Sequence, residues 1–338
     1  MGLCRCRIRF GPLWFPLCAH TSGATGLNHQ DKGMAEAEID AAERDRALRA
    51  QAEQRLYVLG LASVIGASFF TSLAGIFVRL TEDAEGFTLL FYRSLAFVLF
   101  MAVFLGFRYR GRTVDAFRAI GRPGLVVALA LGTSFMSFIF ALMETSVARV
   151  VFIGGTSPFV AAALAWLVLR ERLGPTTLLA MVGALLGIGI MVGEGLAEGS
   201  MLGLLLAFVP VLGYAVTLVC FRFKKGEDML PAVFLAGVFA MVVSGFAAPT
   251  LAISANDLVM AILLGVVQLG FQYVLITYGV RRVSAAEVAL LGRLQLVLGP
   301  LWVWIGVGEV PTVATLLGGG IILAVVMLHP LLMLRGAR

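Results

Sequence analysis

The chain has few charged residues, few histidines and no CxxC cysteine pair. Charged residues make up 14% of its 338 residues and hydrophobic residues 60%, whereas a soluble protein carries about 25% charged residues. A soluble fold of this composition would expose far more apolar surface than water tolerates. The composition therefore excludes an ordinary soluble enzyme and a disordered chain, and it favours a polytopic helical membrane protein.

The cysteine and histidine content argues against a disulfide framework, a metal site and enzyme chemistry. None of the three histidines lies at metal-ligand spacing from a cysteine, and no buried histidine base is placed near a serine or cysteine nucleophile. The net charge of +6 is dispersed among short loops and forms no basic patch. We therefore expect no enzyme activity, no cofactor, no metal and no nucleic-acid partner.

Ten apolar runs are long enough to cross a bilayer. The hydrocarbon core of a bilayer is about 30 Å thick and takes about 20 residues of helix. From residue 56 onward these runs leave no room for an extramembrane catalytic domain. The predicted fold class is therefore all-α and integral to the membrane, with ten transmembrane helices. We place the spans at 57–79, 86–107, 123–143, 147–169, 175–193, 201–222, 230–250, 257–279, 283–305 and 312–334.

The charges of the connecting loops predict the orientation of the chain. If the N-terminus is inside, the loops on that side hold nearly all the arginines and lysines, and the opposite loops hold acidic residues such as Glu82 and Asp83. Basic residues favour the cytoplasmic side. We therefore expect a multi-pass protein of the cell (inner) membrane, surrounded by the lipid bilayer, with both termini cytoplasmic. Arg79 and Arg149 are exceptions, and both lie at span ends.

Residues 1–55 form a predicted cytoplasmic tail. Residues 1–30 loosely resemble a targeting peptide, which would be redundant before a span at residue 57. We favour the interpretation that translation starts at Met34, so that residues 1–33 are not native, and a targeting segment is the alternative. Residues 34–55 are rich in alanine, glutamate and arginine, which is typical of a solvated helix.

The second five spans repeat the first five. Shifted by 138 residues, SVARVVFIGGTSPFVAAALAWLVLRE (146–171) overlays SAAEVALLGRLQLVLGPLWVWIGVGE (284–309) without a gap, and Glu171 falls on Glu309. Because each half holds an odd number of spans, the second half enters the membrane in the opposite orientation. Transporters built this way bind substrate near the midplane between the halves, and a duplication without a transport role is the alternative. The predicted repeats are 56–194 and 195–334.

Residues 141–190 carry a recognisable pattern of segments. The sequence ALMETSVARVVFIGGTSPFVAAALAWLVLRERLGPTTLLAMVGALLGIGI reads as the end of the third span, a small-residue fourth span with a central proline, a Glu-Arg turn and a glycine-rich fifth span. This segment resembles the EamA domains of the drug/metabolite transporter superfamily, and residues 278–326 repeat it more weakly. The second half departs from the pattern, because Leu296 is the counterpart of Pro158 and Arg293 stands where small or apolar residues are usual. The resemblance implies a plasma-membrane carrier of small organic metabolites with a central cavity between its halves.

Arg293 is the sharpest candidate for substrate binding. It lies ten residues into the predicted ninth span, which places it about 15 Å deep at 1.5 Å per residue. An ionisable side chain at that depth is costly and usually faces a partner or a wet cavity. We interpret Arg293 as an anchor that grips a carboxylate or phosphate of the substrate. The alternative is a structural ion pair with a carboxylate such as Glu287.

Four further residues are candidates for substrate binding. Gln268, Gln272 and Tyr273 lie in the eighth predicted span. Gln268 and Gln272 are four residues apart and share a helix face, where they line a cavity or bond to a neighbouring helix. Arg93 lies two turns into the second span and either binds substrate or extends its side chain to the interface. We favour the second interpretation for Arg93.

Several residues at span ends and helix breaks have predicted roles in coupling and motion. Glu144 and Glu287 are candidates for proton coupling, and a solvated end residue is the favoured alternative for each. Glu171 and Glu309 are predicted to cap the helices that follow them. The candidate hinges are Gly154, Pro158 and Pro300, because proline removes a helical hydrogen bond, and ordinary kinks are the alternative.

These observations predict a secondary transporter that moves a small organic metabolite, amino-acid-like or anionic, across the plasma membrane by alternating access. One alternative is an uptake carrier for a cofactor-like metabolite such as S-adenosylmethionine or riboflavin. The alternative from another class is a membrane scaffold protein, which would not need a buried arginine. The expected partners are the small-molecule substrate and the lipid bilayer, and the expected assembly is a monomer or a homodimer.

Overall fold

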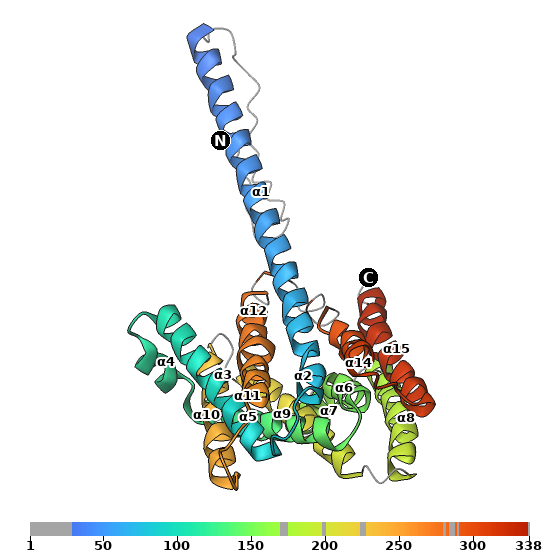
Figure 1. The fold of residues 1–338 in the computed structure, drawn as a ribbon. Coiled ribbons are helices and arrows are strands. Elements are labelled where there is room, and N and C mark those ends of the chain that lie inside the picture. Colours follow the sequence, from blue (N-terminus) through green and yellow to red (C-terminus); the bar gives the residue numbers. More distant parts are fainter. Residues whose placement is uncertain are drawn as a thin grey trace. The chain divides into compact units, whose positions relative to one another are not determined.

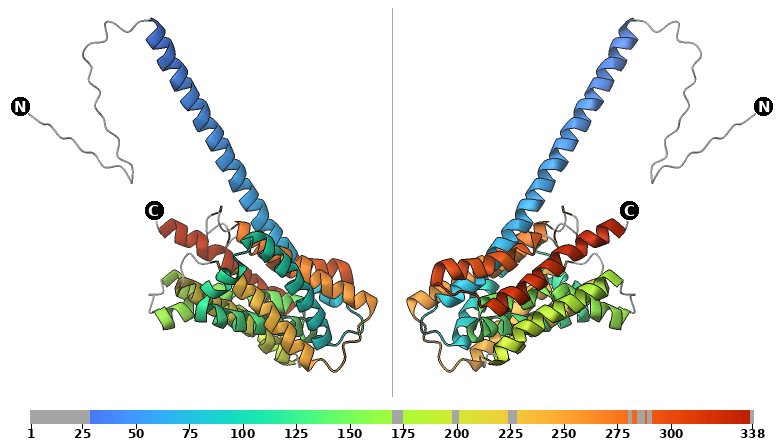
Figure 2. Two further views of the ribbon diagram at one scale, coloured as in Figure 1. Left: turned by 90° about the vertical axis from the view of Figure 1, so that its left-hand side faces the viewer. Right: turned by 90° about the vertical axis from the view of Figure 1, so that its right-hand side faces the viewer.

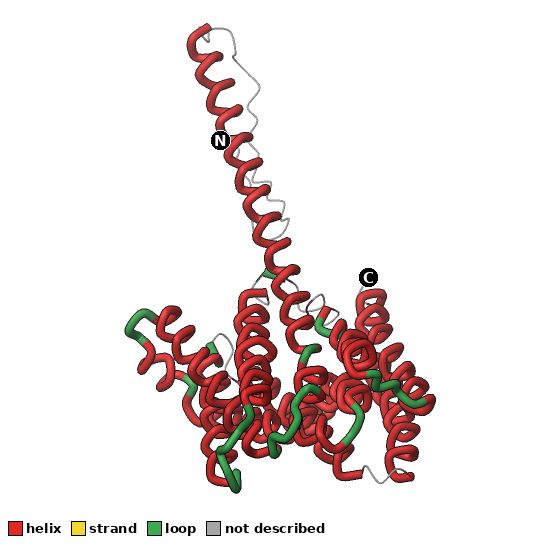
Figure 3. Tube along the Cα trace, in the orientation of Figure 1, coloured by secondary structure: helices red, strands yellow, loops and turns green. Residues whose placement is uncertain are grey.

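The computed structural model describes residues 29–169, 175–197, 201–223, 228–279, 282–283, 288 and 291–336. Throughout these residues the regular elements are helices and no strand occurs (Figures 1 and 3). The chain divides into two compact units, residues 1–55 and residues 56–338. The helical fold class predicted from the apolar runs is therefore confirmed.

The helices of the first repeat follow the predicted spans closely. Long apolar runs without interior breakers favour continuous helix, because lipid offers backbone groups no other hydrogen-bond partner. They are α1 (His29–Ser72), α2 (Ala74–Arg79), α3 (Gly86–Tyr109), α4 (Thr113–Ala119), α5 (Gly121–Glu144), α6 (Val147–Gly155), α7 (Ser157–Leu169) and α8 (Pro175–Ala197).

The helices of the second repeat include one stretch of unusual geometry. Between α11 and α12 the chain adopts a π-helix, η1, whose wider turns are rare and frequent at functional sites. The elements are α9 (Met201–Phe223), α10 (Leu230–Ala247), α11 (Ala255–Ile262), η1 (Leu263–Phe271), α12 (Gln272–Gly279), α14 (Leu294–Val307) and α15 (Val313–Gly336).

Six of the helical segments are long and apolar enough to cross a membrane, judged by length and composition over the part of the chain that is described. They are Leu48–Arg79, Gly86–Tyr109, Gly121–Glu144, Val147–Val168, Leu230–Ala247 and Ala255–Gly279. Four shorter apolar helices are Leu178–Ile190, Met201–Thr217, Leu294–Val307 and Val313–Leu328. Every predicted span overlaps one of these segments, so the chain is a multi-pass helical membrane protein, and the number ten stays a prediction.

Several contacts between helices are preserved when the two repeats are exchanged. α3 packs against its counterpart α10, and α8 packs against its counterpart α15; Figure 2 shows the last pair side by side. Likewise α5 packs against α10, and its counterpart segment α11–η1 packs against α3. Such exchange is the packing expected of two halves related by a two-fold axis.

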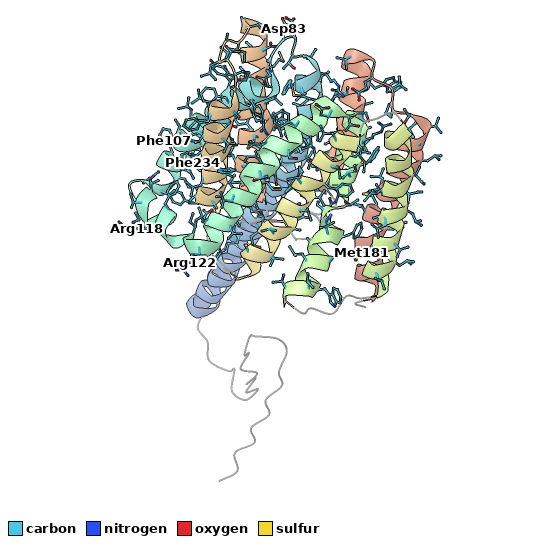
Figure 4. The ribbon with its side chains drawn as sticks, turned by 90° about the horizontal axis from the view of Figure 1, so that it is seen from below. Asp83, Phe107, Arg118, Arg122, Met181 and Phe234 are labelled. Carbon is cyan, nitrogen blue, oxygen red and sulfur yellow. The ribbon has the colours of Figure 1, made fainter. Side chains whose placement is uncertain are left out.

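The two ends of the helix bundle carry different charges. Asp83 and the pair Arg118 and Arg122 lie toward opposite ends in Figure 4; we call these the Asp83 end and the Arg118 end. At the Asp83 end, the Asp257 carboxylate accepts hydrogen bonds from the backbone N–H groups of Glu82 (2.8 Å) and Asp83 (3.2 Å). These bonds fix the α2–α3 loop against the start of α11.

At the Arg118 end, an ion pair joins α3 to the segment before α10. Arg108 Nη2 lies 2.6 Å from Asp228 Oδ2 and its Nε donates to the same oxygen at 3.1 Å. Partial burial raises the pKa of Asp228, but the hydrogen bonds from Arg108 and from the Leu230 backbone N–H outweigh it, and the pKa lies below its usual value. The carboxylate therefore stays ionised and keeps the two elements together.

Candidate functional site

Arg93 of α3 points into the interior of the helix bundle. Its side chain is 1% exposed. Nη1 donates to the backbone carbonyl of Phe135 in α5 at 3.3 Å, and Nη2 donates to Oε1 of Gln268 in η1 at 3.5 Å. The guanidinium carbon lies 5.8 Å from the centroid of the Phe135 ring, within the range of a cation–π contact. The interpretation that Arg93 extends to the membrane interface is therefore wrong, because neighbouring helices hold the side chain inside.

The bonds of Arg93 leave its charge poorly compensated. Both hydrogen bonds are long, and Nε has no hydrogen-bond partner. Among the residues that the structure describes, no carboxylate forms an ion pair with Arg93. A buried charge without a counterion carries a large desolvation penalty. The arrangement therefore suits a site that an anionic group completes.

Three aromatic rings form a wall beside the guanidinium. Phe97 and Phe135 lie 6.0 Å apart between ring centroids, and Tyr273 of α12 lies 6.2 Å from each. Aromatic rings next to a cation offer an apolar surface to the body of a ligand whose anionic end pairs with the cation. Spans two and eight contain four residues predicted to bind substrate, and the structure brings three of them together: Arg93, Gln268 and Tyr273.

Gln268 is the glutamine that contacts Arg93. Gln268 lies inside η1 and is 3% exposed, whereas Gln272 begins α12 and is only partly buried. A π-helix uses i→i+5 bonds instead of the α-helical i→i+4 bonds, and its wider turn still leaves residues four apart on neighbouring positions of one side. The expectation that Gln268 and Gln272 share a face therefore stays a prediction.

Gly265 allows η1 to approach α3 closely. A Cβ atom at this position would overlap the carbonyl oxygen of Arg93, and it would lie 2.9 Å from Ala96 Cβ and 3.0 Å from the Phe97 nitrogen. Backbone cannot yield as a flexible side chain can. The absence of a side chain at Gly265 therefore sets the distance between the backbone that carries Arg93 and the backbone that carries Gln268.

Two helices are interrupted at equivalent positions of the repeat. Thr156 forms a turn between α6 and α7, and Gly292 and Arg293 form a turn directly before α14. The shift of 138 residues carries Gly155 onto Arg293. The hydroxyl of Ser68, in the middle of the predicted first span, donates to the Leu291 carbonyl at 3.0 Å, which places the second interruption at mid-depth. Broken helices at the midplane are where transporters of inverted repeats bind their solutes.

Arg293 lies at this second interruption and is partly exposed. Its role as a substrate anchor stays a prediction. We call Arg93, Gln268 and Tyr273 the central site.

A second polar cluster, at the Asp83 end, joins distant parts of the chain. Arg79 Nε donates to Glu309 Oε2 at 2.6 Å, Nη1 to the Leu142 carbonyl at 2.7 Å and Nη2 to the Thr145 carbonyl at 2.8 Å. Glu309 Oε1 accepts from the backbone N–H of Val147 at 3.0 Å. The prediction that Glu309 caps the helix after it is therefore wrong, because its carboxylate accepts a hydrogen bond from the first backbone N–H group of α6 instead. We call Arg79 and Glu309 the Arg79–Glu309 pair.

Comparisons with known proteins agree with this architecture. The family model described as the EamA-like transporter family matches residues 58–193 and 201–329. The chain belongs to the EamA-like transporter family. One solved structure, described as "Crystal structure of protein", matches over 83% of this chain and 98% of its own with 19% identity and a TM-score of 0.57, which supports a shared fold. A comparison with curated proteins gives no match.

The two EamA matches correspond to the two halves that the shifted sequence predicted, so the resemblance and the internal repeat are confirmed. Membership in this family makes the chain a membrane transporter of the drug/metabolite type, with the bilayer as its surroundings and a small molecule as its substrate.

The remaining predicted residues of this EamA-like transporter lie at span ends and helix breaks. Glu144 is exposed at the end of α5, in agreement with the favoured interpretation of a solvated residue at a span end. Glu287 and Glu171 lie outside the described residues, which leaves the pairing of Arg293 with Glu287 as a prediction. Pro158 stands in the first turn of α7, where proline is tolerated, and Pro300 lies inside α14.

Sequence analysis did not predict the Arg79–Glu309 pair. Arg79 stood out only as a basic residue on the acidic side, and 230 residues separate it from its partner. The repeat offered one usable signal, because Glu309 ends the most similar segment of the second half.

Proposed function

We propose that this EamA-like transporter is a secondary transporter that moves a small organic solute with an anionic group, such as an amino-acid-like metabolite, across the cell membrane by alternating access. The observation that carries the proposal is the buried Arg93 guanidinium, whose Nε has no partner. A carboxylate bound there would supply the missing counterion and accept charge-assisted hydrogen bonds. Phe135 and Tyr273 would contact the apolar part of the solute.

The alternating-access part of the proposal rests on the packing of the two repeats. Several contacts are preserved when equivalent helices are exchanged, and alternating access would exchange the conformations of the two halves. The Asp83 end would then face outward and the Arg118 end the cytoplasm, since basic residues favour the inner side. The driving force would be the solute gradient or a proton, and the ten predicted spans would form two inverted groups of five.

Transport by the purified protein in proteoliposomes tests the assignment of an anionic solute. We expect accumulation or exchange of labelled glutamate, phenylalanine or phenylacetate, because each carries a carboxylate that Arg93 is able to pair. Phenethylamine is the matched control, since it keeps the ring of phenylacetate but carries a cation. Transport of phenethylamine without transport of any carboxylate would contradict the proposal, because a cation cannot approach a buried, uncompensated arginine at low cost.

The interruption in the fourth span is proposed as a hinge. Gly154 lies in the last turn of α6, and a Cβ atom there would meet nothing within 4 Å. Gly154→Ala should therefore raise stability by about 1 kcal/mol through helix propensity alone, while it stiffens the turn and slows transport with the solute's KM unchanged. Gly189→Ala in α8 meets equally open space and serves as the control. Equal transport rates for the two variants, measured beside their melting temperatures, would argue against a hinge at Gly154.

A further inference from the structure

We propose that the Arg79–Glu309 pair is a latch that closes the Asp83 end and must open in every transport cycle. The inference goes beyond the solute and concerns the path by which it reaches the central site. It depends on the contacts that the pair makes, on its partial exposure and on the pocket beside it.

The latch joins four separate stretches of the chain. Arg79 ends α2, and its guanidinium binds the end of α5 through the Leu142 carbonyl, the α5–α6 connection through the Thr145 carbonyl, and the α14–α15 loop through Glu309. The second oxygen of Glu309 holds the Val147 N–H at the start of α6. The two elements interrupted at mid-depth, α6–α7 and α14, are thus tied to one side chain at this end. A rocking motion of these elements has to break the ties.

The exposure of the pair suits a contact that opens and closes. Both side chains are 24% exposed, so water is able to solvate the charges when they separate. A fully buried pair would resist separation, because an uncompensated buried charge is very costly, whereas an exposed pair would hold too weakly. The planar guanidinium also places its donors for three acceptors at once, which a lysine ammonium does not do in the same fixed geometry.

A pocket of about 280 Å³ lies directly against the latch. Its lining at the Asp83 end includes the charged side chains of Arg79, Glu309, Glu144 and Arg149. A solute that arrives from this end would meet this pocket first, and the latch would separate it from the central site. Glu144 shares the pocket but is not a partner of Arg79, since the three acceptors of Arg79 are Glu309, Leu142 and Thr145.

Thiol labelling at the mid-depth interruption tests the latch without any solute. In a full-length variant whose four native cysteines are replaced by serine, Thr156→Cys places one thiol at the turn between α6 and α7, where Thr156 is 2% exposed. A membrane-impermeant maleimide is added from the Asp83 side. We expect Arg79→Gln and Glu309→Gln each to raise the labelling rate about ten-fold, the size of a typical coupling between two sites.

Glu144→Gln is the matched control, because it removes a negative charge from the same pocket without touching the latch. Arg79→Lys should give an intermediate rate, since lysine retains the charge but cannot hold both carbonyls and the carboxylate. Unchanged labelling in Arg79→Gln and Glu309→Gln would overturn the proposal, and so would an equal increase in Glu144→Gln.

If Arg79→Gln fails to fold, Glu309→Gln and Arg79→Lys carry the same test. Because the measurement needs no solute, a failure of the latch is distinguishable from a failure of the anionic-solute assignment.

Discussion

Arg93→Met is expected to abolish transport while leaving the protein at least as stable as the unsubstituted chain. Arg93 is fully buried, its hydrogen bonds are 3.3 and 3.5 Å long, and its Nε is unpaired. Replacing a buried, poorly satisfied charge with an apolar side chain of similar length is often neutral or stabilising, by about 1–4 kcal/mol. Loss of the anionic-solute anchor should reduce transport by about 100-fold or more. Flux in proteoliposomes and thermal melting in detergent measure the two effects separately.

The opposite pattern is expected of Arg108→Met. Arg108 binds Asp228 through two nitrogen atoms at the Arg118 end, away from the central site. Its loss should lower stability by about 0.5–1 kcal/mol, because the pair is partly exposed, and it should leave the KM of the solute unchanged. Stability lost in Arg93→Met together with normal transport would show instead that Arg93 is a structural residue.

More of the fold than of the candidate site could be predicted from the sequence. The apolar runs predicted helices that the structure contains, because a bilayer forces each spanning segment to satisfy its own backbone. The interruption at Thr156 was foreseeable from the Gly-Gly-Thr-Ser-Pro sequence that surrounds it. The interruption at Arg293 was not, since Leu296 replaces the proline of the first repeat. Only the shift between the repeats, which carries Gly155 onto Arg293, marks that position.

The direction of a side chain inside a bundle is not encoded in its spacing alone. Arg93 was expected to reach the interface because its depth permits it, yet contacts from α5 and η1 hold it inside. Those contacts come from residues 42 and 175 positions away in the sequence, and no local pattern of apolar residues indicates them. The pairing of Arg79 with Glu309 is likewise a result of tertiary packing. The residue types thus indicated which charged side chains are costly to bury in a membrane. The tertiary packing determined which residues those side chains contact.

Gly265→Ala is expected to lower both the stability of the protein and its affinity for the solute, because η1 approaches α3 closely at this residue. The new Cβ would overlap the Arg93 carbonyl oxygen and crowd Ala96, so one of the two helices has to move. Overpacking of this kind costs about 1–3 kcal/mol. Because the same contact sets the separation of Arg93 from Gln268, we also expect the KM for a carboxylate solute to rise about ten-fold.

Gly320→Ala in α15 is the control for Gly265→Ala, since a Cβ there meets nothing within 4 Å. It should preserve KM and leave the melting temperature unchanged or raised. Melting curves and transport rates at several solute concentrations measure both variants. A lower melting temperature for Gly265→Ala with an unchanged KM would mean that the contact serves stability alone. A raised KM in Gly265→Ala, with Gly320→Ala unaffected, would tie the spacing of α3 and η1 to the binding of the solute, because Arg93 and Gln268 are the polar groups that this spacing positions.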